Sequence, residues 1–201
     1  MKKDLYHHGN LKEDLIQISF DVIQNEGIES LTLKKLSEKT GTSRSAIYRH
    51  FKSKEDLVET ILLSGFDHFD SIIAPVFCDK KIDLLDRFYK SGRLYIEFAK
   101  ENPNLYKLIF GKRYSHIRES LRSINDDECL AFNALKNALI EGQECGVFKE
   151  FDPHSQAIVI WASLHGISSL IVNGFMDVET IYEDVYDTMF ENMLNGIIKA
   201  D

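Results

Sequence analysis

Residues 32–57, which read TLKKLSEKTGTSRSAIYRHFKSKEDL, constrain the fold of this chain more than any other stretch. Two short segments with helical spacing meet at Gly41, and glycine tolerates the positive φ that a tight turn between crossing helices requires. Leu33, Leu36 and Ile47 supply apolar contacts near the crossing. The pattern predicts a helix-turn-helix, whose second helix is suited to the major groove of DNA.

Three helix starts in the same stretch agree with this prediction. Thr32 and Ser43 are suitable N-caps for the two helices. Ser53, followed three residues later by Asp56, forms a capping box that opens another helix directly afterwards. Caps and turn residue all favour the same local fold, and such agreement is stronger than any single signal.

Charge is concentrated on this motif. The whole chain has a formal net charge of −8, which argues against general affinity for nucleic acid. Residues 34–54 nevertheless carry seven cationic side chains against Glu38 alone, a net charge of +6. An ordinary solvated helix pair would also account for the charge, but together with the caps and the turn it favours a specific DNA-binding protein. The seven cations are Lys34, Lys35, Lys39, Arg44, Arg49, Lys52 and Lys54.

The segment Gly41–Leu57 resembles the signature of the TetR family of bacterial transcriptional regulators, and the resemblance extends over residues 8–62. It implies an α-helical homodimer that represses transcription from a palindromic operator. It also implies release from DNA when a small ligand enters the C-terminal domain. Two later segments, 95–111 and 161–166, are similar to one subgroup of the family that has a Trp/His-Gly motif.

The helix after Ser43 is expected to carry DNA recognition, because the N-terminal residues of such a helix face the groove. Arg44 and Ser45 are the candidates for base edges, and Arg49 for a base or a phosphate. By resemblance, Tyr48 and His50 hold the DNA backbone; a buried structural role is the alternative for His50. The full predicted DNA-binding set is Thr32, Thr42, Ser43, Arg44, Ser45, Tyr48, Arg49, His50 and Lys54.

Composition predicts an all-α chain. Apolar residues make up 44% of the 201 residues, and only three prolines and eleven glycines interrupt them. We expect a head of three helices in a DNA-binding domain, residues 1–52, and a regulatory and dimerisation domain, residues 53–201. The expected helices of the second domain are 53–75, 79–100, 103–110, about 115–141 ending at Gly142 and Gly146, 153–173, and one from 177 to about 197.

Compartment and membrane status also follow from composition. Three widely spaced cysteines, Cys78, Cys129 and Cys145, are expected to be reduced core thiols of a bacterial cytoplasmic protein. The longest apolar region, residues 157–172, contains several polar residues, so no membrane span is expected.

The second domain is rich in aromatic residues that are candidates for an unknown small-molecule ligand. Ordinary core packing is the alternative for each of them. His165 shares a helical face with Trp161 and needs a polar partner, which is either a ligand or a neighbouring side chain. The predicted ligand-binding residues are Phe66, Phe69, Tyr89, Tyr95, Tyr106, Phe110, Trp161 and His165.

The expected partners are double-stranded DNA and a second copy of the chain, since useful specificity needs two half-sites. By resemblance, the last two helices form a four-helix bundle with their symmetry mates, although the same residues could form intrachain core. The candidate contacts are Ile158, Leu164, Ile171, Tyr182, Tyr186, Met189, Met193 and Ile197.

Other functional classes have less support. We find no HExxH, GxSxG or CxxC motif and no Gly-rich phosphate loop, so we expect no enzyme activity, no cofactor and no metal. A helical interaction protein or an activator that keeps the head fold is the alternative hypothesis.

Overall fold

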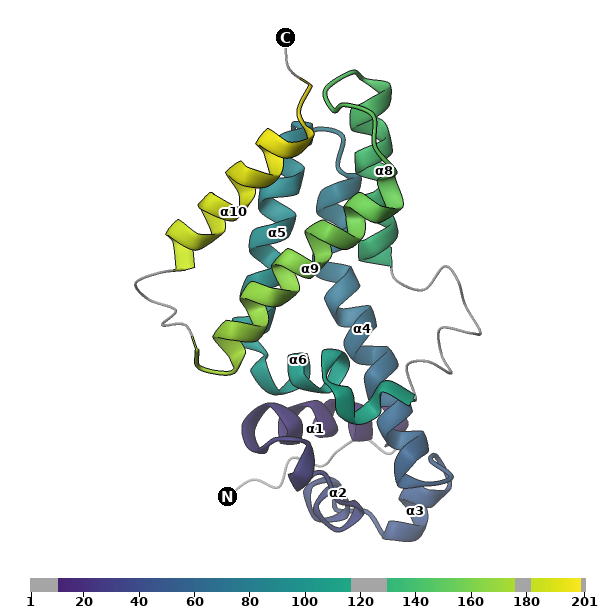
Figure 1. Cartoon of the computed structure of the whole chain (residues 1–201). Helices are drawn as coiled ribbons and strands as arrows, with labels where there is room; N and C mark the ends of the chain where they lie inside the picture. Colours follow the sequence, from purple (N-terminus) through teal and green to yellow (C-terminus); the bar gives the residue numbers. More distant parts are fainter. Residues whose placement is uncertain (1–10, 117–129, 176–181, 200–201) are drawn as a thin grey trace. The chain divides into compact units, whose positions relative to one another are not determined.

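The computed structural model describes residues 11–116, 130–175 and 182–199, and these residues are helical apart from turns and one isolated antiparallel bridge between Phe148 and Ile198 (Figure 1). The predicted all-α fold is confirmed. The α-helices are α1 (Leu11–Glu26), α2 (Leu33–Thr40), α3 (Arg44–Tyr48), α4 (Lys54–Cys78), α5 (Leu84–Glu101), α6 (Pro103–Phe110), α8 (Leu130–Glu144), α9 (Pro153–Val172) and α10 (Tyr182–Ile197), with 3-10 turns η1 (Ile28–Ser30) and η2 (Lys112–Tyr114).

Contacts divide the chain into two compact units. Unit 1 comprises residues 1–66 and 102–120, and unit 2 comprises residues 67–101 and 121–201. The continuous helix α4 contributes its first half to unit 1 and its second half to unit 2. This division differs from the expected boundary after residue 52, because α6 and the first half of α4 pack with the head.

Unit 1 is built around α1, which packs against both α2 and α6. Its centre is made of aliphatic side chains that are at most 1% exposed. Gly65 of α4 lies so close to α6 that a Cβ there would be 2.8 Å from Ile109 Cγ2. The buried side chains include Leu15, Ile23, Leu36, Ile47 and Leu57.

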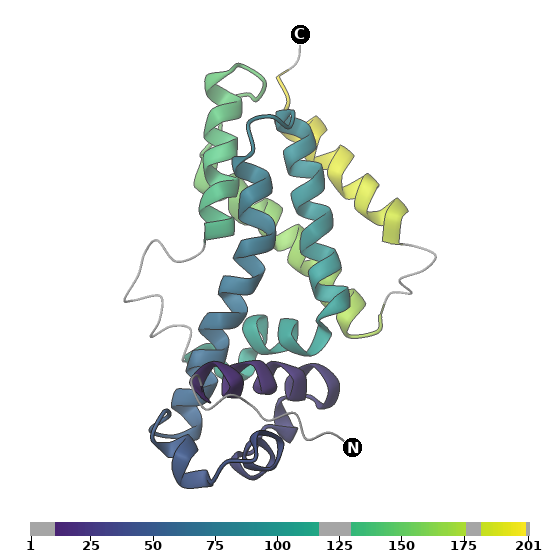
Figure 2. The ribbon, with the colours of Figure 1, turned by 180° about the vertical axis from the view of Figure 1, so that it is seen from behind.

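Unit 2 is a layered helical body in which α9 crosses α5 and α8 (Figures 1 and 2). Its core is largely aromatic: Phe69 is fully buried, and its ring lies 5.1 Å from that of Tyr95 and 5.8 Å from that of Trp161, both edge-on. Edge-to-face pairs of this kind add to the free energy gained from burial alone.

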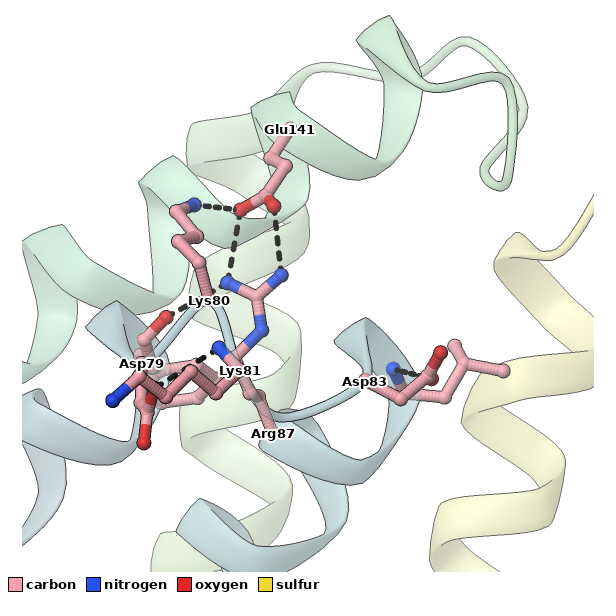
Figure 3. Close-up of polar contacts among 8 residues, drawn as sticks. Asp79, Lys80, Lys81, Asp83, Arg87 and Glu141 are labelled. Carbon is pink, nitrogen blue, oxygen red and sulfur yellow. Dashed lines mark hydrogen bonds and ion pairs between the residues drawn. The ribbon is translucent and has the colours of Figure 1, made fainter.

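A buried ion pair joins three segments of unit 2 (Figure 3). Arg87 of α5 is 3% exposed and donates to both carboxylate oxygens of Glu141 on α8, at 2.9 and 2.7 Å. The same guanidinium donates to the carbonyl oxygen of Phe77, near the end of α4, at 2.9 Å. Lys80 also pairs with Glu141. These hydrogen bonds, chiefly the one from Arg87, lower the pKa of Glu141 to about 2.

Three expected helix boundaries are wrong. Residues 79–83 lie outside the helices: the Asp79 carboxylate accepts from Lys81 N in a turn, and the Asp83 carboxylate accepts from Leu85 N as the N-cap of α5, so that helix begins only at Leu84. Helix α4 continues past Pro75 to Cys78. Gly142 lies inside α8 and leaves room for the ring of Phe148, whereas Gly146, with φ of 73°, follows the end of the helix.

The other boundaries in unit 2 agree with expectation as far as they are described. Helix α9 begins after Asp152, whose side chain accepts from Ser155 N, and ends before Asn173. The expected helix start at Asp177 lies outside the described residues, in segment 176–181, and the start expected at Ser115 or later runs into segment 117–129, which is also outside them.

Helices α4 and α9 are long and apolar enough to cross a membrane by length and composition. Helix α9 is interrupted by Ser163, His165 and Ser168, and both helices contribute buried residues to a helical core. Core helices of this kind meet the same criteria, so the observation is weak support for a membrane span.

Candidate nucleic-acid interface

The turn between α2 and α3 is fixed by backbone geometry and by side chains. Gly41 adopts the left-handed conformation, with φ of 68° and ψ of 18°, as expected for a helix C-cap. The Ser37 hydroxyl donates to the carbonyl oxygen of Thr42, and the hydroxyls of Thr40 and Thr42 lie 3.1 Å apart. These contacts set the angle at which α3 leaves α2.

Each helix of the motif begins at the predicted cap. The Thr32 hydroxyl accepts from Lys35 N at 3.2 Å, and the Ser43 hydroxyl accepts from Ala46 N at 3.2 Å. At the start of α4, the Ser53 hydroxyl accepts from Asp56 N at 3.1 Å.

Asp56 completes the capping box by reaching back along the chain. Its carboxylate accepts from Lys52 N at 2.6 Å, so the backbone before α4 is held at two points. Lys54, the first residue of α4, is exposed. A cation at the positive end of a helix is suited to receive a phosphate.

Helix α3 has one buried and one exposed side. Ala46 and Ile47 are buried at 6% and 0% exposure and anchor α3 to unit 1, as does Phe51 just beyond it. Tyr48 is 53% exposed although it is a large aromatic residue. The buried alternative for His50 is wrong, because the packing of Ile47 and Phe51 turns His50 outward. The exposed side chains of this segment are Ser43, Arg44, Ser45, Tyr48, Arg49 and His50.

The cations of the motif differ in how they are paired. Lys34 lies 3.8 Å from Glu38, and Lys35 pairs with Glu26, whose pKa is lowered chiefly by that hydrogen bond. Arg44, Arg49 and Lys52 have no acidic group within 4 Å among the residues that the structure describes. Their positive charge therefore remains available to an external anion.

Two exposed cations, Lys39 and Lys52, belong to the same surface but were absent from the predicted DNA-binding set. Both were among the seven cations counted in residues 34–54 of the sequence. The nine predicted residues all fall in unit 1, from the start of α2 to the start of α4. Thr42 is half-buried in the turn, so its role there includes holding the turn.

Formal charge is divided unequally between the two units. Unit 1 has fourteen Lys and Arg against eleven Asp and Glu, whereas unit 2 has ten against twenty-one. Unit 2 therefore repels phosphate and unit 1 does not. This distribution favours DNA contact by the unit that contains the helix-turn-helix.

The predicted ligand-binding residues divide between the units. Phe66, Tyr106 and Phe110 lie in unit 1, where the ring of Phe110 meets that of Phe66 edge-on at 5.8 Å and that of Tyr106 at a tilt, at 4.8 Å. They do not line the cavity that unit 2 contains. Tyr89 is likewise outside that lining and donates to Asp187 at 2.9 Å, which is the first cause of its raised pKa.

Two of the remaining predicted ligand residues line a small internal cavity of about 20 Å³ in unit 2, and the other two contact them. Tyr95 and Trp161 line it, and Phe69 packs against both. His165 finds its polar partner within the chain, with Nδ1 3.4 Å from the Tyr95 hydroxyl. Sequence analysis missed Ser91, Met189 and Met193 in this lining. Helical spacing places each of them on an apolar face, but only packing shows what they surround.

A second, larger hollow of about 760 Å³ lies between α9 and α10. Near it, Ile158 and Val159 are 49% and 57% exposed, which is unusual for aliphatic side chains. Several predicted dimer contacts are buried within the single chain, and Leu164 and Tyr186 among them pack against Gly92 of α5. The buried ones are Leu164, Ile171, Tyr186 and Ile197, whereas the side chain of Tyr182 lies outside the described part.

The expectation of buried cysteines is wrong for two of the three. Cys78 and Cys145 are exposed at helix ends, and Cys129 lies outside the described residues. Among the described residues, no three His, Cys, Asp or Glu side chains are grouped as a metal site would require.

Two family models match the chain. One, for bacterial regulatory proteins of the tetR family, covers residues 15–61, and the other, for a tetracyclin repressor-like C-terminal domain, covers residues 88–197. The chain belongs to the TetR family. The two matched regions contain the helix-turn-helix and most of unit 2.

The chain is also similar to a curated relative and shares its fold with solved structures. The nucleoid occlusion factor SlmA of Vibrio cholerae is 32% identical over 114 residues, which are 56% of this chain and 58% of that protein. A Rhodococcus protein of unknown function superposes with a TM-score of 0.81 at 22% identity, covering 98% and 100% of the two chains. The Bacillus subtilis regulator FadR, solved with stearoyl-CoA, superposes with a TM-score of 0.71 at 19% identity, covering 92% and 98%.

Proposed function

We propose that this TetR-family protein is a dimeric, cytoplasmic transcriptional regulator that binds a palindromic operator through α3 and leaves it when a small ligand binds unit 2. The observation that carries the proposal is the exposed, unpaired positive charge of α3 on a turn held rigidly by caps and by Gly41. Arg44 and Ser45 are proposed to read base edges. Tyr48, His50 and Lys54, with Thr32 and Thr42, are proposed to hold phosphates.

Dimerisation is proposed to use α9 and α10, with a second copy occupying the groove between them. The groove is partly apolar, and the exposed Ile158 and Val159 lie on the same helix that forms one of its walls. Two copies related by a two-fold axis would present two reading helices to successive half-sites.

Connectivity suggests how a ligand could act at a distance. Helix α4 is continuous through both units, and α5 of unit 2 leads directly into α6 of unit 1 at Asn102. A ligand that favours one arrangement of unit 2 would change the spacing of the two heads by its differential affinity for the two states.

Operator binding by Arg44→Ala tests the proposal. We expect the purified protein to shift a duplex taken from upstream of its own coding region. Arg44→Ala should weaken this binding about 5- to 150-fold, the loss that follows from removing one bidentate base contact. Lys81→Ala, which removes an exposed cation of unit 2, is the matched control and should bind normally. Equal affinity of both variants and the parent protein would exclude α3 as the reading helix.

A second candidate function follows from similarity to nucleoid occlusion factors. A DNA-bound interaction protein with the same head would also carry the exposed α3. Its affinity for DNA would not depend on small molecules. Deletion of its gene would leave the transcription of adjacent genes unchanged. A transcription profile of a deletion strain separates the two functions.

A further inference from the structure

The Ser91 hydroxyl is buried without a hydrogen-bond partner. Ser91 of α5 is 1% exposed, and its Oγ makes no hydrogen bond. A buried serine inside a helix ordinarily donates to the carbonyl four residues earlier, as Ser19 does to Leu15 at 2.6 Å. A buried polar group without a hydrogen-bond partner lowers the stability of the fold, so it requires an explanation.

Ser91 lines the 20 Å³ cavity of unit 2. The other described lining side chains are aliphatic, aromatic or methionine, and no carboxylate, ammonium or guanidinium group is among them. The hydroxyls of the two lining tyrosines are already engaged: Tyr95 with His165, and Tyr186 with the carbonyl oxygen of Tyr89. The cavity therefore presents apolar walls and one unused hydrogen-bonding group.

Two methionines form part of the cavity wall that faces the groove. Ile160, Met189 and Met193 line both this cavity and the 760 Å³ groove between α9 and α10, so these side chains form part of the boundary between the two spaces. Methionine is unbranched and adapts to new shapes at little cost. The cavity as it stands holds about one water molecule, and movement of this wall would enlarge it toward the groove.

We propose that this cavity binds a neutral, hydrocarbon-rich molecule with one hydrogen-bonding group, which is held by Ser91 Oγ while its chain displaces Met189 and Met193. The inference rests on the proposed regulator function and names the class of its effector. The net charge of unit 2, with twenty-one acidic and ten basic side chains, disfavours an anionic ligand. Because the displaced side chains also line the groove, ligand binding would change the shape of the surface that we assign to the second copy.

Trp161 gives a direct assay, because it lines the cavity and is the only tryptophan in the chain. We expect 1-dodecanol, added to the purified full-length protein, to change Trp161 emission saturably with one site per chain. Dodecanoate, which has the same chain length and carries a negative charge, should bind at least tenfold more weakly when used below its micelle concentration.

Ser91→Ala separates a binding role from a structural one. The variant should bind 1-dodecanol about 2- to 10-fold more weakly, as expected for the loss of one neutral hydrogen bond. Without ligand it should melt at the same temperature as the parent or higher, because no hydrogen bond is lost in the free protein. Ser19→Ala is the matched control: it should lower the melting temperature and leave dodecanol binding unchanged.

Two results would overturn the inference: no saturable response of Trp161 to 1-dodecanol, or unchanged dodecanol affinity in Ser91→Ala. Operator binding by the same preparation is measured in parallel. If the duplex is bound but dodecanol is not, the ligand class is wrong and the regulator function stands. If dodecanol binds at Ser91 but no duplex is bound, the cavity assignment stands and the regulator function fails.

Discussion

At Arg87, a guanidinium group lies almost fully inside unit 2, and its neighbours explain how the fold accommodates it. The carboxylate of Glu141 and the carbonyl oxygen of Phe77 accept its hydrogen bonds, while Nε has no partner. Removing either charge would leave the other poorly solvated, which is more costly than the pair itself is worth. The pair therefore matters for the choice of helix packing as much as for stability.

Glu141→Gln should make stability less dependent on pH. The folded-state pKa of Glu141, about 2, is below its ordinary value of 4.5, so its contribution is complete above pH 4.5 and is lost as pH falls toward 2. At pH 7 we expect the variant to lose about 1–2 kcal/mol of unfolding free energy, since the Glu141 side chain is 25% exposed and solvent screens part of the interaction. Urea unfolding measured from pH 7 down to pH 3 should show the difference in unfolding free energy between parent and variant decreasing as the pH falls.

The control for this prediction is Glu144→Gln, which changes an exposed carboxylate on the same helix. It should alter stability by less than about 0.5 kcal/mol at any pH in the range. A difference between Glu141→Gln and the parent that stays constant with pH would show that the carboxylate charge is not what Arg87 requires.

At the scale of the element, α3 and α8 depend on residues outside themselves. Helix α3 has five residues, too few to be stable alone, and it persists because of the Ser43 cap and its buried Ala46 and Ile47. Helix α8 begins at Leu130, where Asp70 of α4 accepts from the N–H groups of Leu130 and Ala131 at 3.1 and 3.0 Å. A distant carboxylate thus acts as the N-cap.

Asp70→Ala should loosen the start of α8. Loss of the two acceptors is expected to cost about 1–3 kcal/mol and to speed amide hydrogen exchange at Leu130 and Ala131. Asp70→Asn keeps one acceptor oxygen and should lower the unfolding free energy by less than Asp70→Ala does. Burial disfavours the charged carboxylate and raises the pKa of Asp70, although the two backbone hydrogen bonds act in the opposite direction.

Glu59→Ala is the control, since Glu59 is an exposed acidic residue about three turns earlier on α4. It should leave exchange at the start of α8 unchanged. Similar exchange rates in Asp70→Ala and the parent would mean that other contacts hold this end of α8.

At the scale of the whole molecule, function is expected to require two copies. Val159→Asp places a charge among the apolar side chains of the α9–α10 groove, where Val159 is 57% exposed. We expect sedimentation equilibrium to show a monomer, and operator affinity to fall at least about tenfold because the two heads are no longer linked.

Leu130→Asp is the matched control, because Leu130 is 60% exposed and lies on α8, outside the groove lining. It should remain dimeric and bind operator normally. A dimeric Val159→Asp protein would place the subunit contact elsewhere.

Sequence alone determined the local structure of the head. Caps at Thr32, Ser43 and Ser53, the positive-φ glycine and the local charge are all properties of adjacent residues, so a single pass along the chain detects them. The all-α class and family membership follow from the same kind of local signal. The predicted start of α5 was wrong because Asp79 forms a turn and Asp83, four residues later, is the N-cap.

Tertiary structure decided everything that depends on residues far apart in the chain. The bond from Asp70 to α8 spans about sixty residues, and the pair of Arg87 with Glu141 spans more than fifty. The same holds for the cavity that isolates the Ser91 hydroxyl and the wall it shares with the groove. Helical periodicity gives the face on which a side chain lies, whereas packing alone determines what meets that face.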